Sequence, residues 1–149
     1  MKQNNFIVNQ NSKLLTIAFF FLLTGLFSCS KNDASQNQNV NNQQLQEGSW
    51  KITNFWDKDH DETAVFSSYQ ITFNSDGTVS AVNGGTTVSG TWSTSTDDSQ
   101  PKLILFFSAS PFTEISDDWH ITSQTDNLIQ LEDVSGGGGE TELLTLEKI

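Results

Sequence analysis

Short runs of alternating apolar and polar residues fill the chain from Glu47 to Ile149, and this pattern constrains the fold more than any other feature of the sequence. Alternation with a period of two puts successive side chains on opposite faces of a β-strand. The runs therefore predict eight strands, at Ser49–Trp56, Ser68–Asn74, Thr78–Val82, Thr86–Ser93, Lys102–Phe107, Asp118–Gln124, Leu128–Glu132 and Glu142–Lys148.

The connections between these runs are short and rich in turn residues. Residues 74–77 read Asn-Ser-Asp-Gly and residues 83–85 read Asn-Gly-Gly, and both patterns are typical of tight β-hairpins. No segment shows a convincing helical period, although residues 110–115 are compatible with one helical turn after Pro111. An all-β meander of eight antiparallel strands forms either an up-and-down barrel, which we favour, or a two-sheet sandwich.

The apolar face of the predicted strands carries many aromatic rings. The interior of an eight-stranded barrel is either filled by side chains or just wide enough for one small ligand. We therefore weigh two interpretations, a packed core and a small cavity that binds a flat or lipid-like apolar ligand. The residues predicted to point inward, and to line that cavity, are Trp50, Ile52, Trp56, Tyr69, Phe73, Trp92 and Trp119.

A motif at the start of the first run is also found in a known family. Gly48-Ser49-Trp50 matches the Gly-x-Trp that opens the first strand of lipocalins, and residues 47–149 resemble the short lipocalin-like domains of bacterial lipoproteins. The resemblance implies an up-and-down barrel whose closed end is plugged by Trp50. Lipocalins usually place an arginine of the last strand over that tryptophan. This chain has no arginine, and Lys148 is the nearest substitute.

The first 28 residues have the organisation of a signal peptide. The apolar run Leu14–Phe27 is 14 residues long and follows a polar start with two lysines, and it is too short for a membrane-spanning helix. Leu26-Phe27-Ser28-Cys29 resembles the lipobox of bacterial lipoproteins, which implies cleavage before Cys29 and a lipid on its thiol. We expect a lipid-anchored protein of the cell envelope, with the outer membrane as the favoured location. The alternative is an ordinary signal peptide followed by an unrelated cysteine.

Residues 29–46 are rich in Asn, Gln and Ser and contain few apolar side chains. Such a composition cannot offset the entropy cost of folding, so this segment is predicted to be a flexible tether. The expected organisation is a signal peptide at 1–28, a lipidated tether at 29–46 and a barrel domain at 47–149.

Acidic residues dominate the charge of the chain. The 18 acids against 7 lysines give a net charge of −11, which excludes nucleic acid as a partner because affinity for phosphate comes mainly from lysine and arginine. In a meander the acids gather in the loops around one end. There Asp57, Asp59 and Asp61 alternate, and such a loop can turn several oxygens toward one Ca²⁺, with an acid from residues 114–118 completing the site. A solvated acidic loop is the alternative.

The sequence holds no catalytic constellation that we recognise. His60 and His120 are far apart in the sequence, and there is neither a cysteine nucleophile nor a Gly-x-Ser-x-Gly motif. We expect a non-catalytic binding module for a small apolar ligand, or for a basic envelope protein at the acidic rim. The alternative is a structural or interaction protein of the envelope with a solid core, stabilised in one version by Ca²⁺. Apart from Ca²⁺, no cofactor is expected.

Overall fold

The computed structural model of the protein describes residues 40–97, 99–134 and 140–149. These residues belong to one compact unit. The predicted signal peptide, Cys29 and most of the predicted tether lie outside the described residues. Every contact reported below is made within residues 40–149, so a fragment that begins at Ser30 keeps the whole of this hydrophobic core.

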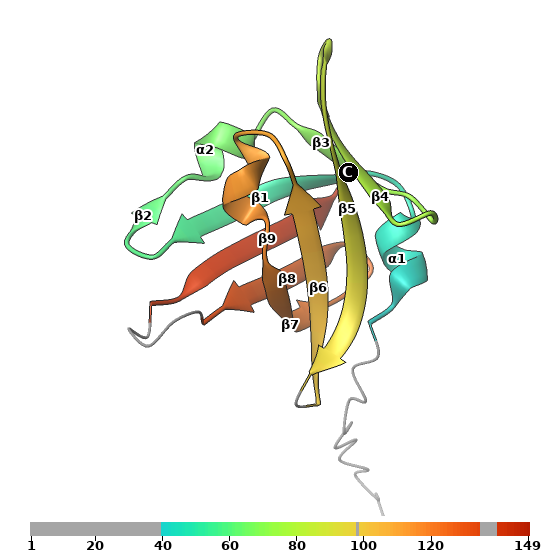
Figure 1. The fold of residues 1–149 in the computed structure, drawn as a ribbon, viewed down its shortest axis with the longest axis vertical. Coiled ribbons are helices and arrows are strands. Elements are labelled where there is room, and N and C mark those ends of the chain that lie inside the picture. The colour runs from blue at the N-terminus through green and yellow to red at the C-terminus, as the bar shows by residue number, and fades with distance from the viewer. Residues whose placement is uncertain (1–39, 98, 135–139) are drawn as a thin grey trace, which may run out of the picture. The chain divides into compact units, whose positions relative to one another are not determined.

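Eight antiparallel strands close into a barrel (Figure 1). Each strand pairs with the next in the chain, and the last pairs with the first from Trp50↔Lys148 to Trp56↔Leu143. This ring confirms the predicted barrel and excludes the sandwich. The strands are β1 (Trp50–Asp57), β3 (Gln70–Phe73), β4 (Thr78–Asn83), β5 (Thr86–Asp97), β6 (Gln100–Phe107), β7 (Asp118–Gln124), β8 (Leu128–Asp133) and β9 (Glu142–Lys148).

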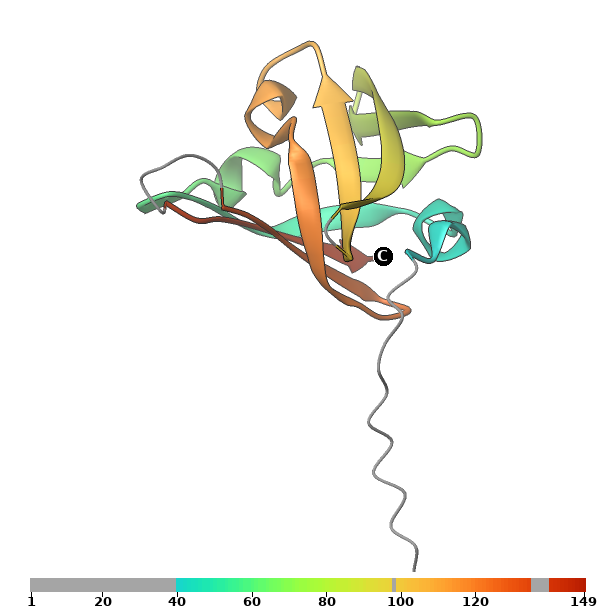
Figure 2. The same cartoon turned by 60° about the horizontal axis from the view of Figure 1, so that its bottom comes forward.

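Short elements outside the ring cover its two ends. The two-residue strand β2 (His60–Asp61) pairs with the end of β1, and helix α2 (Thr63–Phe66) follows it. A 3-10 helix, η1 (Phe112–Ile115), lies between β6 and β7 and confirms the turn predicted after Pro111. Figure 2 shows α2 and η1 at one side of the barrel and helix α1 (Asn42–Gln46) at the other. Among the described residues, no helix is long and apolar enough to cross a membrane.

Helix α1 corrects the prediction that residues 42–46 belong to a flexible tether. The side chain of Leu45 is completely buried, and its carbonyl accepts a hydrogen bond from Trp50 Nε1 at 2.9 Å. Gln44 Nε2 donates to Asp126 Oδ1 at 2.9 Å, which joins α1 to the turn between β7 and β8. So short a helix has almost no stability of its own. It forms because it packs on the end of the barrel, and the composition of residues 42–46 alone does not indicate that packing.

Replacing Leu45 with alanine is expected to lower the free energy of unfolding by about 2–5 kcal/mol, the usual cost of emptying a buried leucine site. Gln43→Ala is the matched control, because Gln43 lies on the exposed side of the same helix. Urea denaturation of the 30–149 fragment measures both. Equal, small losses would mean that α1 does not pack on the barrel.

The closed end has the arrangement implied by the lipocalin resemblance. Trp50 is completely buried, and Lys148 Nζ lies 5.6 Å from the centre of its ring, a cation–π distance. Lys148 also lies 3.6 Å from Glu47 Oε2. Lysine therefore occupies the place over the tryptophan that arginine takes in lipocalins.

A β-bulge in β1 makes one inward-pointing residue differ from the prediction. The pairing of β1 with β9 shifts register between Ile52 and Asn54, so Thr53 is an extra residue. An extra residue exchanges the two faces of the strand beyond it. Phe55 is therefore completely buried, whereas Trp56, which was predicted to point inward, lies outside and is 39% exposed.

Candidate functional site

Most of the residues predicted to line a cavity lie in one packed core. Trp50, Ile52, Phe73, Trp92 and Trp119 are buried members of a single hydrophobic cluster, and Tyr69 is partly buried against it. The rings of Phe73 and Trp92 meet edge to face with their centres 5.5 Å apart. The indole N–H groups of Trp92 and Trp119 donate to the carbonyls of Asn74 and Ile115. These contacts favour the packed-core interpretation over a ligand cavity.

Aromatic rings from α2 and η1 fill the other end of the interior. Phe66 and Phe112 are completely buried, and their ring centres lie 5.2 Å apart. Phe112 also contacts Phe107 at 4.9 Å and Tyr69 at 4.9 Å, and Phe66 contacts Phe55 at 5.5 Å. None of Phe55, Phe66 and Phe112 was predicted to lie in the core. Phe66 and Phe112 lie on short helical turns without a readable period, and Phe55 follows the β-bulge in β1. A small surface hollow of about 180 Å³ lies at the α1 end and is lined mainly by the hydroxyl-bearing residues 94–96, unlike the apolar cavity predicted.

The three alternating aspartates do not converge on one point. Among the described residues, two groups have potential ligand atoms within 4.8 Å of one another, and neither contains Asp59 or Asp61. The side chain of Asp59 is 92% exposed. Asp61 Oδ1 instead accepts the backbone N–H of Thr63 at 2.9 Å, at the start of α2. The predicted Ca²⁺ site at these three residues is therefore not assembled.

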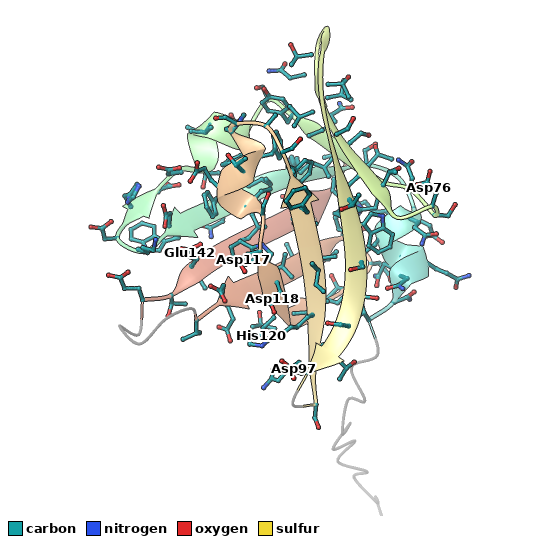
Figure 3. The ribbon with its side chains drawn as sticks, viewed as in Figure 1. Asp76, Asp97, Asp117, Asp118, His120 and Glu142 are labelled. Atoms are coloured by element: carbon teal, nitrogen blue, oxygen red, sulfur yellow. The ribbon has the colours of Figure 1, made fainter. Side chains whose placement is uncertain are left out.

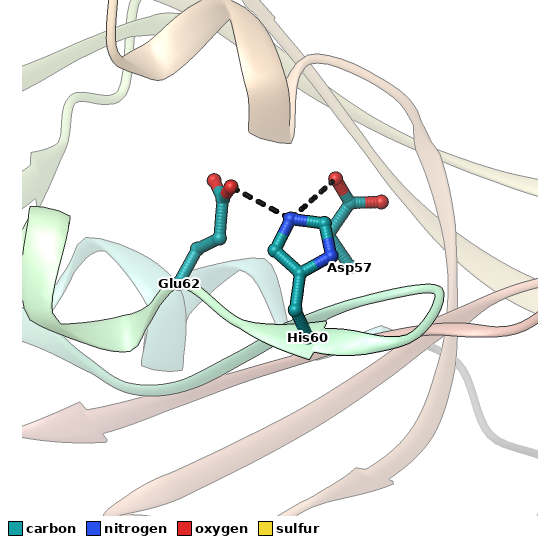
Figure 4. Close-up of side chains that lie close together, drawn as sticks. All are labelled: Asp57, His60 and Glu62. Carbon is teal, nitrogen blue, oxygen red and sulfur yellow. Dashed lines mark hydrogen bonds and ion pairs between the residues drawn. The ribbon is translucent and has the colours of Figure 1, made fainter.

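Asp57 instead belongs to a group with His60 and Glu62 (Figure 4). His60 Nε2 lies 2.9 Å from Glu62 Oε1 and 3.9 Å from Asp57 Oδ2, and Nδ1 lies 2.7 Å from Asp59 Oδ1. A neutral imidazole can donate through only one nitrogen. Two carboxylates at the two nitrogens therefore favour the charged ring, and the hydrogen bond to Asp59 followed by that to Glu62 raises the pKa of His60.

An NMR titration of the His60 ring is expected to show a midpoint above the ordinary value of 6.5. Because the pKa is raised in the folded protein, the stabilisation from this group is fully present below pH 6.5 and is lost as the pH rises through the folded-state pKa. Asp59→Asn should lower the midpoint, since it removes the largest contribution. A midpoint at or below 6.5 in the unsubstituted protein would contradict the ion-paired arrangement.

The ends of four neighbouring strands carry inward-pointing carboxylates. The burial patterns of β1, β8 and β9 place Asp57, Asp133 and Glu142 on the same face as the core residues, and Asp117 lies just before β7 on that face. Figure 3 shows Asp117 and Glu142 at one side of the barrel and Asp76 at the opposite side. We call Asp57, Glu62, Asp117, Asp118, Asp133 and Glu142 the acidic rim.

Lysines neutralise part of the acidic rim. Lys58 Nζ lies 3.4 Å from Glu142 Oε1 and 3.7 Å from Asp57 Oδ1. Lys102 Nζ lies 2.6 Å from Asp118 Oδ2. Burial raises the pKa of Glu142, and the neighbouring charges of Asp57 and Asp133 add to this rise.

Asp133 is the most buried carboxylate of the acidic rim. Its residue exposure is 6%, and Oδ2 has no hydrogen-bond partner among the described residues. Burial raises the pKa of the neighbouring Asp117, with a further contribution from the charge of Asp133. The burial of Asp133 could have been predicted from the sequence. Asp133 continues the alternation of Ile129 and Leu131 and therefore falls on the apolar face of the strand.

No protein-family model matches the sequence, and no curated protein matches it. Among solved structures, the chain is similar to the crystal structure of a DUF4847 family protein from Bacteroides vulgatus ATCC 8482. The identity is 18% and the TM-score is 0.47, and the alignment covers 69% of this chain and 93% of that one.

Proposed function

We propose that this protein is a non-catalytic binding module of the cell envelope, held to the membrane by a lipid on Cys29, that engages a basic partner protein through its acidic rim. The observation that carries the proposal is the placement of six carboxylates at one end of the barrel: at the ends of β1 and β8, at the starts of β7, β9 and α2, and just before β7. Charge of one sign concentrated on one face speeds and orients association with a partner of opposite sign.

The packing of the interior supports the rim over the interior as the binding surface. The rings of Phe55, Phe66, Phe107 and Phe112 contact one another or Trp119 beneath the rim. A ligand would have to displace these contacts, and tightly packed cores resist such rearrangement. The proposed binding module therefore has the solid core that the sequence left open as an alternative, and its partner binds at the acidic rim.

The surroundings of His60 support a non-catalytic role. Both ring nitrogens of His60 face carboxylates on an exposed hairpin. Within the described residues, no serine, threonine or cysteine side chain forms a hydrogen bond with His60. A nucleophile activated by a histidine requires such a bond.

Photo-crosslinking in living cells tests the rim as a partner surface. A photo-reactive amino acid replaces Val65, which is 48% exposed on α2 beside the rim, and in a second strain it replaces Ser75 in the turn at the opposite end. We expect one discrete adduct from position 65 with a basic protein and none from position 75. Adding Asp57→Asn and Glu62→Gln should reduce the adduct, because both changes remove partly exposed charge from the acidic rim beside α2. Equal adducts from both positions, or none, would contradict the proposal.

The membrane anchor is tested separately. Cys29→Ser is expected to move the protein from the membrane fraction to the soluble fraction and to abolish labelling by a radioactive fatty acid, because the thiol is the acceptor. Ser30→Ala is the matched control and should change neither. Retention of the label in the Cys29→Ser variant would overturn the lipoprotein interpretation.

A further inference from the structure

We propose that Asp117, Asp118 and Asp133 form a binding site for a divalent cation, and that Ca²⁺ is the ion that suits it best. The site lies on the acidic rim but does not depend on the basic partner proposed above. It also differs from the Asp57, Asp59 and Asp61 loop that the sequence pointed to.

The strand pairing brings the three carboxylates together. β7 and β8 are antiparallel neighbours with His120 opposite Glu132, so the start of β7 meets the end of β8. One oxygen from each of Asp117, Asp118 and Asp133 lies within 4.8 Å of the other two. Two oxygens bound to one Ca²⁺ at about 2.3–2.6 Å each can be up to about 5 Å apart. The observed separations therefore fit a shared cation without movement of the backbone.

The buried, unpaired oxygen of Asp133 is the observation that points to a ligand. Asp133 is only 6% exposed, and no described residue donates to Oδ2. A buried carboxylate oxygen without a partner is costly, and such groups usually contact an ion or an ordered water molecule. The other group of converging ligand atoms, at Asp57, His60 and Glu62, is more exposed, and its imidazole nitrogens already face carboxylates.

The charge around the site is incompletely neutralised. Lys102 pairs with Asp118 at 2.6 Å and also reaches Asp97 at 3.6 Å. Lys58 is engaged by Asp57 and Glu142. Asp117 and Asp133 therefore have no salt bridge to a basic side chain among the described residues. Asp117 Oδ1 accepts the backbone N–H of Asp118, at 2.7 Å.

The donor set selects the kind of ion. All three groups offer hard carboxylate oxygens, and neither histidine nor cysteine belongs to the cluster, which disfavours Zn²⁺ and Cu²⁺. Mg²⁺ requires near-ideal octahedral geometry, whereas Ca²⁺ accepts irregular sets of six to eight oxygens, including bidentate carboxylates and water. Asp118 is exposed, so water can complete the coordination shell. We expect a dissociation constant of about 0.1–1 mM, the range of extracellular calcium modules.

Calorimetry and thermal unfolding of the 30–149 fragment test the site, at constant ionic strength with Ca²⁺, Mg²⁺ or a chelator. The unsubstituted fragment is expected to bind one Ca²⁺ and to gain about 5 °C in Tm at a calcium concentration ten times the Kd. Asp133→Asn and Asp117→Asn should each weaken binding at least tenfold. Asp59→Asn is the control, since it removes the same charge from a nearby side chain that is 92% exposed, and it should retain binding within about twofold.

A second measurement guards against a variant that simply fails to fold. In chelator, Asp133→Asn is expected to have a higher Tm than the unsubstituted fragment, because the amide removes the buried, unpaired negative charge. Absence of saturable Ca²⁺ binding at millimolar concentrations, an equal loss in Asp59→Asn, or Mg²⁺ binding as tight as Ca²⁺ binding would each overturn the proposal. These results are independent of the crosslink from position 65, so either proposal can fail alone.

Discussion

Replacing Phe55 with alanine is expected to destabilise the barrel by about 3–5 kcal/mol, the range for truncating a fully buried phenylalanine. Phe55 is 0% exposed, and its ring meets Phe66 at 5.5 Å and Trp119 at 6.4 Å. The substitution removes a ring that joins β1 to α2 and β7, and the structure around such a cavity relaxes only partially. Urea denaturation of the 30–149 fragment, followed by tryptophan fluorescence, measures the loss.

Trp56→Ala is the matched control for this prediction. Trp56 is the larger side chain, but it is 39% exposed and its indole donates only to the nearby carbonyl of Lys58, at 3.0 Å. We expect a loss of no more than about 1 kcal/mol, as for surface positions outside the core. The pair tests the bulge at Thr53 directly. A larger loss for Trp56→Ala than for Phe55→Ala would mean that β1 keeps strict alternation and that Trp56 points inward.

Gly90→Ala is expected to cost about 3 kcal/mol or more, because β5 and β6 approach too closely there for any side chain. A Cβ atom at position 90 would overlap the carbonyl oxygen of Phe106 and would lie 2.7 Å from the ring of Phe107. Both neighbours belong to the paired strand, so relief of the clash requires the ladder to open. A loss of about 3 kcal/mol is a large part of the free energy of unfolding of a typical domain, which is about 5–15 kcal/mol.

Gly85→Ala gives the comparison for that prediction. A Cβ atom at Gly85 meets nothing within 4 Å, so its effect should stay within about 0.5 kcal/mol of zero. Thermal unfolding of the two variants, prepared in parallel, measures the difference. A Gly90→Ala variant as stable as Gly85→Ala would show that β5 and β6 are not paired in the observed register.

The eight strands could be predicted from the sequence, because the alternation that gives each strand one apolar face lies within that strand's own residues. All eight predicted runs overlap strands of the barrel, and the hairpins at residues 74–77 and 83–85 join β3 to β4 and β4 to β5. The sequence offered Lys148 only as the nearest substitute for the arginine of lipocalins, and the structure places its Nζ 5.6 Å from the centre of the Trp50 ring.

The elements that could not be predicted are those created by tertiary contact. The sequence around Thr53 does not indicate a bulge, yet this extra residue turns Phe55 inward and Trp56 outward. The stability of α1 comes from burial of Leu45 and from bonds to the other side of the chain, such as Gln44 to Asp126. Local propensity does not contain these interactions.

The acidic rim was predictable as a region but not as a set of contacts. Alternation of Asp57, Asp59 and Asp61 suggested that these three residues meet within one loop. In that loop Asp57 instead groups with His60 and Glu62, and the second group joins Asp117 and Asp118 to Asp133 on the neighbouring strand. The pairing that brings β7 beside β8 is non-local. The same pairing determines which acid is buried, and burial rather than number of charges distinguishes Asp133 from its neighbours.

The central claim is that this barrel binds at its acidic rim and not in its interior, and an NMR titration of the isotope-labelled 30–149 fragment tests it most directly. Calcium should produce saturable shifts in the backbone amide signals of Asp117, Asp118 and Asp133. A long-chain fatty acid added afterwards should leave the indole signals of Trp50, Trp92 and Trp119 unmoved. Saturable shifts of those indole signals with the fatty acid, together with no response to calcium, would contradict the account.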